Sequence, residues 1–147
     1  MLTLTQIKPP NKSILVNFSL ALTAEERTRS RHRFTTVEGE IVYLHLPRGT
    51  VLQAGDLLQD YGETILVRVS AKSEPVITVT TTNSLELLKA AYHLGNRHVP
   101  VEISTDYLRL APDPVLQKML EQLNFEVISE IMPFFPEQGA YKHHSNG

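Results

Sequence analysis

The chain has 147 residues and a formal net charge of −2, with 41% hydrophobic and 20% charged residues, the balance of a soluble globular protein. It contains no cysteine, which excludes disulfides, thiolate metal sites, iron–sulfur clusters and a cysteine nucleophile. The near-neutral charge gives no reason to expect nucleic acid as a partner. No apolar run approaches the ~20 residues that span a bilayer, and no signal-peptide pattern is present, so we expect a cytoplasmic protein without membrane contact.

The two halves differ in charge and in the spacing of their apolar residues. Residues 1–72 carry nine Lys or Arg against seven Asp or Glu, whereas residues 73–147 carry five against nine. Strand-like alternation dominates the first half, and mixed elements follow. We therefore predict a small β domain over residues 1–72, a mixed domain over 73–136 and a flexible histidine-containing tail over 137–147.

Alternating apolar residues in the first half predict strands over 14–22, 27–34, 41–46 and 65–69, hence a small antiparallel β domain. Thr23 and Glu26 have capping-box spacing for one helical turn. Four arginines recur at every second position and would project from one strand face: Arg27, Arg29, Arg31 and Arg33. That face could attract an acidic partner, but a solvated face paired with carboxylates is the favoured interpretation.

The second half alternates strands and helices. Strands are expected over 76–80, 99–103, 107–110 and 127–131. One helix begins after an Asn83 N-cap and ends with Gly95 at the C′ position, and another begins at Asp113-Pro114 and ends near Asn124. The order βαββαβ predicts a ferredoxin-like domain, so the whole chain is expected to be α+β.

Enzyme motifs are absent from the sequence, and no nucleophile, base and orienting group can be assembled, so we expect no catalysis. The remaining candidates are the histidines. His32 and His45 lie within expected strands and are best interpreted as ordinary residues, while His93 suits the carbonyl end of its helix.

His98 differs because it follows the end of the helix, on an expected surface corner. A divalent ion needs several ligands, which could come from His143 and His144 in the tail, or from a second subunit across a twofold axis. Spacing alone still favours a plain surface histidine over a metal ligand.

Two segments resemble a known family: Ala91 to Pro100, read as AYHLGNRHVP, and Pro136 to Tyr141, read as PEQGAY. They look like the urease accessory protein UreE family of nickel metallochaperones. Leu46 to Leu52, followed by Gly55-Asp56, is similar to the N-terminal domain of that family.

The resemblance implies a peptide-binding-like β domain, a ferredoxin-like domain and a homodimer joined through the C-terminal domains. It also implies that His98 of each subunit binds Ni²⁺ at the dimer interface, with Zn²⁺ or Cu²⁺ possible in vitro, and that His143 or His144 adds ligands. The expected partners are the GTPase UreG and the urease apoprotein. An adaptor that scaffolds urease assembly, with metal binding incidental, is the competing function.

The sequence also departs from the family. Pro112 and Pro114 flank Asp113 where some relatives have a His-x-His pair, so we predict no peripheral metal site there. Glu102 stands where an amide is common in relatives, and we expect its carboxylate to face solvent.

Overall fold

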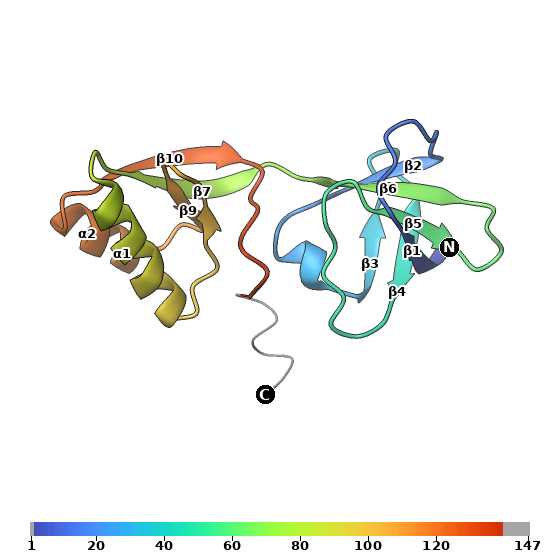
Figure 1. The fold of residues 1–147 in the computed structure, drawn as a ribbon. Helices are drawn as coiled ribbons and strands as arrows, with labels where there is room; N and C mark the ends of the chain where they lie inside the picture. The colour runs from blue at the N-terminus through green and yellow to red at the C-terminus, as the bar shows by residue number, and fades with distance from the viewer. Residues whose placement is uncertain (1, 140–147) are drawn as a thin grey trace. The chain divides into compact units, whose positions relative to one another are not determined.

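The computed structural model describes residues 2–139 of the chain (Figure 1). It divides into two compact units, residues 1–72 and residues 73 onward. In the described part, no helix is long and apolar enough to cross a membrane. Each unit has its own sheet and its own hydrophobic core, and together they make the α+β architecture that the sequence predicts.

The first unit is a six-stranded sheet in the order β2-β6-β5-β1-β4-β3. Its strands are β1 (Leu2–Lys8), β2 (Phe18–Leu22), β3 (Arg31–Thr35), β4 (Ile41–His45), β5 (Leu57–Asp60) and β6 (Leu66–Ala71). The β domain is confirmed, but its sheet is mixed, because β1 pairs with β4 and β2 with β6 in parallel. Leucine and valine side chains from several of these strands form the core, among them Leu4, Leu20, Val42, Leu44 and Val67.

The capping box of the first unit is confirmed. The Thr23 N–H donates to Glu26 Oε1 at 2.9 Å and the Glu26 N–H donates to Thr23 Oγ1 at 3.2 Å. The short 3-10 helix η1 (Glu26–Thr28) follows, so the strand expected over 27–34 begins only at Arg31.

The four alternating arginines therefore do not share one strand face. Arg27 lies in η1, is only 5% exposed and donates from Nη1 to the Leu22 carbonyl. Arg29 pairs with Glu25 at 3.0 Å, as the favoured interpretation required.

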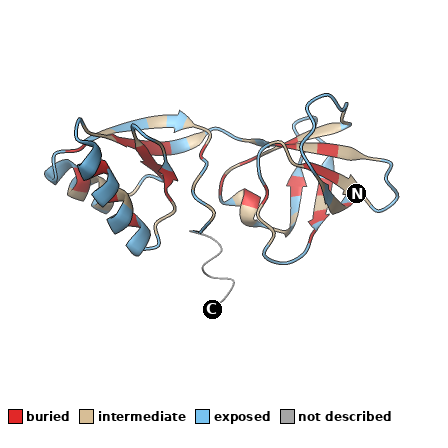
Figure 2. Cartoon of the chain, viewed as in Figure 1, coloured by how far each residue is buried: buried red, intermediate tan, exposed pale blue. Residues whose placement is uncertain are grey.

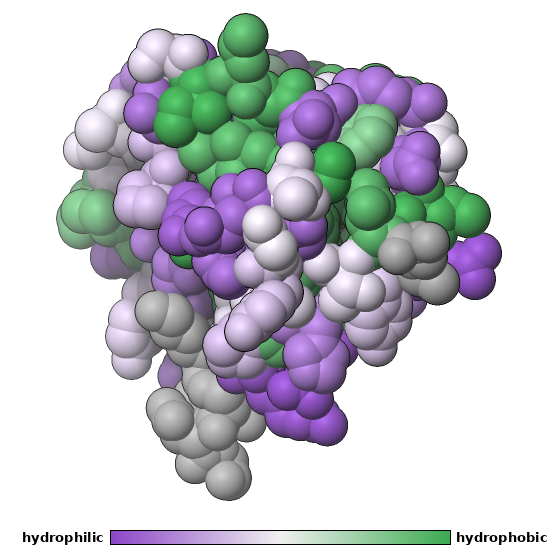
Figure 3. All heavy atoms as spheres, turned by 90° about the vertical axis from the view of Figure 1, so that its right-hand side faces the viewer, coloured by the Kyte–Doolittle hydropathy of each residue, from purple (hydrophilic) through white to green (hydrophobic). Residues whose placement is uncertain are grey.

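Figure 3 shows one face of the molecule, where hydrophobic side chains gather in separate clusters between hydrophilic ones.

The second unit is a four-stranded antiparallel sheet in the order β10-β7-β9-β8. Its elements are β7 (Glu74–Thr80), α1 (Ser84–Asn96), β8 (Glu102–Ile103), β9 (Leu108–Leu110), α2 (Pro114–Gln122) and β10 (Glu126–Met132). The chain order βαββαβ with this strand order is the predicted ferredoxin-like arrangement. Both helices lie on the same face of the sheet (Figure 1).

The residues coloured as buried in this unit lie mainly on β7, β9 and the inward sides of the helices, while the outward helix surfaces are exposed (Figure 2). The core of this unit joins Ile77, Val79 and Leu108 from the strands with Leu94 and Leu120 from the helices. Because neighbouring residues of a strand point to opposite faces, Thr78 and Arg109 must face away from the helices.

Candidate metal centre

Both helices of the second unit begin as predicted. The Asn83 side chain accepts hydrogen bonds from the N–H groups of Leu85 and Glu86 at the start of α1. The Asp113 carboxylate does the same at the start of α2, where Pro114 occupies the first helical position.

The end of α1 differs from the prediction. Gly95 lies inside the helix, and the left-handed residue is His98, with φ of 59°. The His98 N–H donates to the Gly95 carbonyl at 3.0 Å and the Val99 N–H donates to the Leu94 carbonyl at 3.1 Å, which makes a Schellman motif with His98 at C′. The expectation that Gly95 occupies C′ is therefore wrong.

The end of α2 provides a comparison within the same unit. Asn124 has φ of 69°, and the Phe125 N–H donates to the Leu120 carbonyl at 3.1 Å, so this helix also ends in a Schellman motif. Asparagine tolerates a left-handed backbone, whereas for most other residues it costs about 1–2 kcal/mol. A histidine at C′ therefore carries a cost in backbone free energy. Its side chain places an exposed imidazole at the end of α1.

His98 borders a hollow of about 330 Å³ in the second unit. Helix α1 contributes Ala91 and Gly95 to its lining, the following segment contributes His98, Val99, Val101 and Ile103, and the chain after β10 contributes Glu137 and Gly139. A Cβ atom built on Gly95 would meet nothing within 4 Å, so this glycine leaves open space beside the histidine.

An apolar stripe continues from this hollow along α1. Leu85, Leu88 and Tyr92 are exposed at i, i+3 and i+7, which places them on one face of the helix. Gly95 lies three residues beyond Tyr92 on the same face, so the stripe ends at the hollow that His98 borders.

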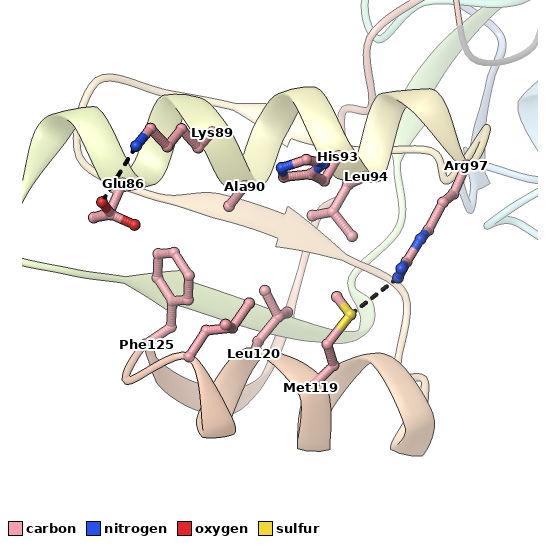
Figure 4. A pocket seen from close by; sticks show the side chains of 10 residues that line it. Glu86, Lys89, Ala90, His93, Leu94, Arg97, Met119, Leu120 and Phe125 are labelled. Carbon is pink, nitrogen blue, oxygen red and sulfur yellow. Dashed lines mark hydrogen bonds and ion pairs between the residues drawn. The ribbon is translucent and has the colours of Figure 1, made fainter.

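His93 lies on a different side of α1. It lines a groove of about 350 Å³ between α1 and α2, together with Lys89, Leu94 and Leu120 among others. Figure 4 shows the side chains of both helices around this groove, with Arg97 Nη1 lying 3.0 Å from Met119 Sδ. His93 is in the last turn of α1, as predicted for a residue that meets the carbonyl end of the helix dipole.

The other histidines are remote in the chain from this site or outside the described residues. His32 lies in β3 with its ring centroid 4.7 Å from that of Phe34, and His45 is exposed in β4. His143 and His144 follow Gly139 by four and five positions and lie outside the described part of the chain.

Glu102 does not face solvent, contrary to the expectation from sequence. It is 9% exposed, and its Oε2 lies 3.2 Å from Arg109 Nη1 and accepts the Tyr107 hydroxyl at 3.0 Å. Its Oε1 accepts the Phe135 N–H at 3.0 Å. Nothing in the local sequence shows these partners, since Tyr107 precedes β9, Arg109 lies in β9 and Phe135 lies in the chain after β10.

Comparison with known proteins identifies the family. Residues 4–72 match the UreE urease accessory protein N-terminal domain, and residues 74–147 match the UreE urease accessory protein C-terminal domain. The chain belongs to the UreE family of urease accessory proteins. The two matches meet at the boundary between the two structural units.

Full-length relatives bear the same family name. The chain is 61% identical to the urease accessory protein UreE of Nostoc punctiforme, covering 98% of this chain and 97% of that one. It is 54% identical to that of Thermosynechococcus vestitus, covering 98% of this chain and all of that one. Membership of the UreE family indicates a role in urease maturation as an accessory protein.

Within residues 2–139 of this UreE-family chain, no group of three or more His, Asp or Glu side chains could hold a metal ion. First-row divalent ions need several ligands at once. A metal held at His98 would therefore need at least one further donor from outside the described side chains, such as a second copy, the residues after Gly139 or water.

Proposed function

We propose that this chain is a nickel metallochaperone of urease maturation, in which His98 from each of two copies binds one Ni²⁺ ion. The observation that carries the proposal is the exposed imidazole at the left-handed C′ position of α1, at the end of an apolar helix face. Family membership indicates the process, which is urease maturation, and the C′ position of α1 provides the proposed ligand, which is His98.

A twofold axis would solve the shortage of donors at His98. An isologous interface places the same residue of both chains near the axis, so one histidine per chain becomes two. The apolar stripe Leu85, Leu88 and Tyr92 provides surface that a second copy could bury. Both features favour a homodimer formed through the second unit.

The proposed ligands suit Ni²⁺ but do not exclude other first-row divalent ions. Two imidazoles, completed by His143, His144 and water, are ligands for Ni²⁺, Cu²⁺ or Zn²⁺, so availability must select among these ions. Exposed ligands can be exchanged one at a time, which suits an ion that is cargo. The recipients would be the GTPase UreG and then the urease apoprotein, in the cytoplasm.

The decisive variant is His98→Gly, because glycine removes the imidazole and is the preferred residue at C′. His93→Ala is the matched control, since it removes an exposed histidine from α1 itself, five residues before His98. We expect calorimetric titration to find one tight Ni²⁺ per two chains in the unchanged protein and in His93→Ala. His98→Gly should lose that site while keeping its thermal stability.

Urease activation in cells then separates carrier from scaffold. If the protein delivers nickel, His98→Gly should lower urease activity at limiting nickel, and His93→Ala should not. Unchanged nickel binding and unchanged activation in His98→Gly would overturn the proposal in favour of an adaptor that acts through protein contacts.

A further inference from the structure

The groove between α1 and α2 has an apolar floor. Its volume is about 350 Å³, and its buried lining comes from Ala90 and Leu94 on α1, from Leu120 on α2 and from Phe125. Leu123, at the end of α2, also lines the groove and is itself 60% exposed. The groove therefore offers apolar surface to a molecule that enters it from solvent.

The two ends of this groove differ in charge (Figure 4). At the end near Phe125, Lys89 Nζ lies 3.8 Å from Glu86 Oε1, so these two charges offset each other. At the other end, Arg97 Nη1 lies 3.0 Å from Met119 Sδ. A thioether sulfur is uncharged and a weak acceptor, so it does not offset the positive charge of the guanidinium.

A second hollow, of about 560 Å³, adjoins the charged end of the groove. Arg97 and Met119 line both spaces, and the exposed Lys118 of α2 lines the second. Within residues 73–139, the Lys and Arg side chains that form ion pairs with carboxylates are Lys89 and Arg109. Arg97 and Lys118 are the two that do not, and both border the same hollow.

This grouping is notable because the second half of the sequence is acidic, with five Lys or Arg against nine Asp or Glu. The unpaired positive charge of the described part of the unit lies at one end of an apolar groove. A ligand that is complementary to both features has an apolar face with carboxylates beside it.

The shape of the groove favours a helix as that ligand. Two helices bound the groove along its length, and a third helix can pack against both at the usual spacing of ~8–10 Å between axes. An amphipathic helix presents apolar side chains at i, i+3, i+4 and i+7, which suits an elongated apolar floor. Carboxylates on its flank would meet the two cations and set its direction in the groove.

We propose that the groove between α1 and α2 docks an amphipathic helix of a partner protein, with its carboxylates against Arg97 and Lys118. Met119 and Leu123 contact the apolar face of that helix. The groove shares no lining residue with the hollow at His98, so this docking site is distinct from the candidate metal centre. His93 also lines the groove, and we assign it no contact with the partner.

The probe is a fluorescently labelled synthetic helix of about 20 residues, with leucines on one face and glutamates on its flanks. A second peptide has lysine at every glutamate position, so the two share one apolar face and differ in charge. Fluorescence anisotropy with the metal-free full chain, at about 0.15 M salt, gives both dissociation constants. The unchanged protein should bind the glutamate peptide about 10-fold more tightly than the lysine peptide.

The variants change exposed positions, so the fold should persist in all of them. Lys118→Glu and Arg97→Gln should each weaken binding of the glutamate peptide by about 5-fold. Lys118→Glu should also strengthen binding of the lysine peptide, because it turns a repulsion into an attraction. Lys12→Glu, in the first unit, is the control for net charge and should leave both constants unchanged. Leu123→Ser should weaken both peptides alike, by about 10-fold, since it removes apolar contact and no charge.

Equal affinity of the unchanged protein for the two peptides, or binding of neither, would overturn the inference. A dimer that is present in the unchanged protein and lost in Leu123→Ser, measured by sedimentation, would make a second copy the occupant and would also overturn it. So would displacement of the glutamate peptide by an equal concentration of decanoate, which has a carboxylate and an apolar chain but no helix. Every measurement uses metal-free protein, so each outcome is independent of nickel binding at His98.

Discussion

At the scale of single residues, substitutions at His98 separate its left-handed backbone conformation from the proposed metal ligation by its imidazole. Glycine has no steric cost at φ of 59°, whereas alanine has the cost without the imidazole. We predict that chemical denaturation of the metal-free protein shows His98→Ala to be about 1 kcal/mol less stable than His98→Gly. Asn124→Ala against Asn124→Gly should give a similar difference at α2, and equal stability of the two His98 variants would contradict the left-handed assignment.

Asp60 in the first unit provides a prediction on pH. The hydroxyl of Thr64 and the N–H groups of Ile65 and Thr64 donate to its carboxylate and hold the pKa of Asp60 below its ordinary value of 3.8. A lowered folded-state pKa gives stability that is present above pH 3.8 and is lost as pH falls through the folded value. Asp60→Asn should therefore flatten the decline in stability as pH falls below about 4, measured by urea denaturation. An unchanged slope would show that the carboxylate contributes nothing to it.

Residue environments were the hardest feature to predict from the sequence. Asn83, Asp113 and Asn124 were identified correctly, because capping depends on neighbours within a few positions. Glu102 was predicted to face solvent, and Arg27 to lie on a strand face, yet both are buried. Arg27 binds a carbonyl five residues away, and Glu102 binds a backbone N–H 33 residues away, so only the tertiary fold reveals the pairing of Glu102.

At the scale of elements, Gly95 weakens α1 without a packing reason in a single chain. A Cβ there meets nothing within 4 Å, and glycine inside a helix costs roughly 0.5–1 kcal/mol relative to alanine. Gly95→Ala should therefore raise the stability of a monomeric form by about that amount in thermal unfolding. Gly95→Leu would also fill the hollow at His98, so it should weaken Ni²⁺ binding. Full nickel affinity in Gly95→Leu would mean that the open space is unimportant.

The sequence predicted the elements best where hydrophobic period and caps agree. Helices α1 and α2 carry both signals, whereas β7 and β10 were predicted from their strand-like residues alone. The β1 strand was missed although Leu2 and Leu4 alternate with threonines, and β5 has no alternation because Leu57 and Leu58 are both buried. Of the strand predicted over 99–103, only the two residues of β8 form a strand. The Val99 N–H instead donates to the Leu94 carbonyl at the end of α1.

At the scale of the whole molecule, the fold was predictable because each unit has its own local pattern, whereas the proposed metal site needs ligands from more than one segment, which no local pattern shows. One chain presents a single histidine at the hollow among its described residues. Sequence resemblance pointed to His98, and the structure adds the left-handed corner, the apolar stripe and the segment 133–139 beside it. In the proposed function, assembly of two copies is therefore the property on which nickel binding depends most.

Leu88→Glu tests that dependence. Leu88 is 68% exposed in the middle of the apolar stripe on α1, and a charge there would oppose burial of the stripe between two copies. Val115→Glu is the control, because Val115 is 78% exposed on α2 and outside the stripe. Sedimentation should show Leu88→Glu as a monomer and Val115→Glu as a dimer.

Nickel titration should find the tight shared site only in the dimer, since a monomer offers one His98 where the proposed site needs two. A monomeric Leu88→Glu that still binds one Ni²⁺ tightly through His98 would show that the tail completes the site within one chain. The twofold arrangement would then be unnecessary for holding the ion.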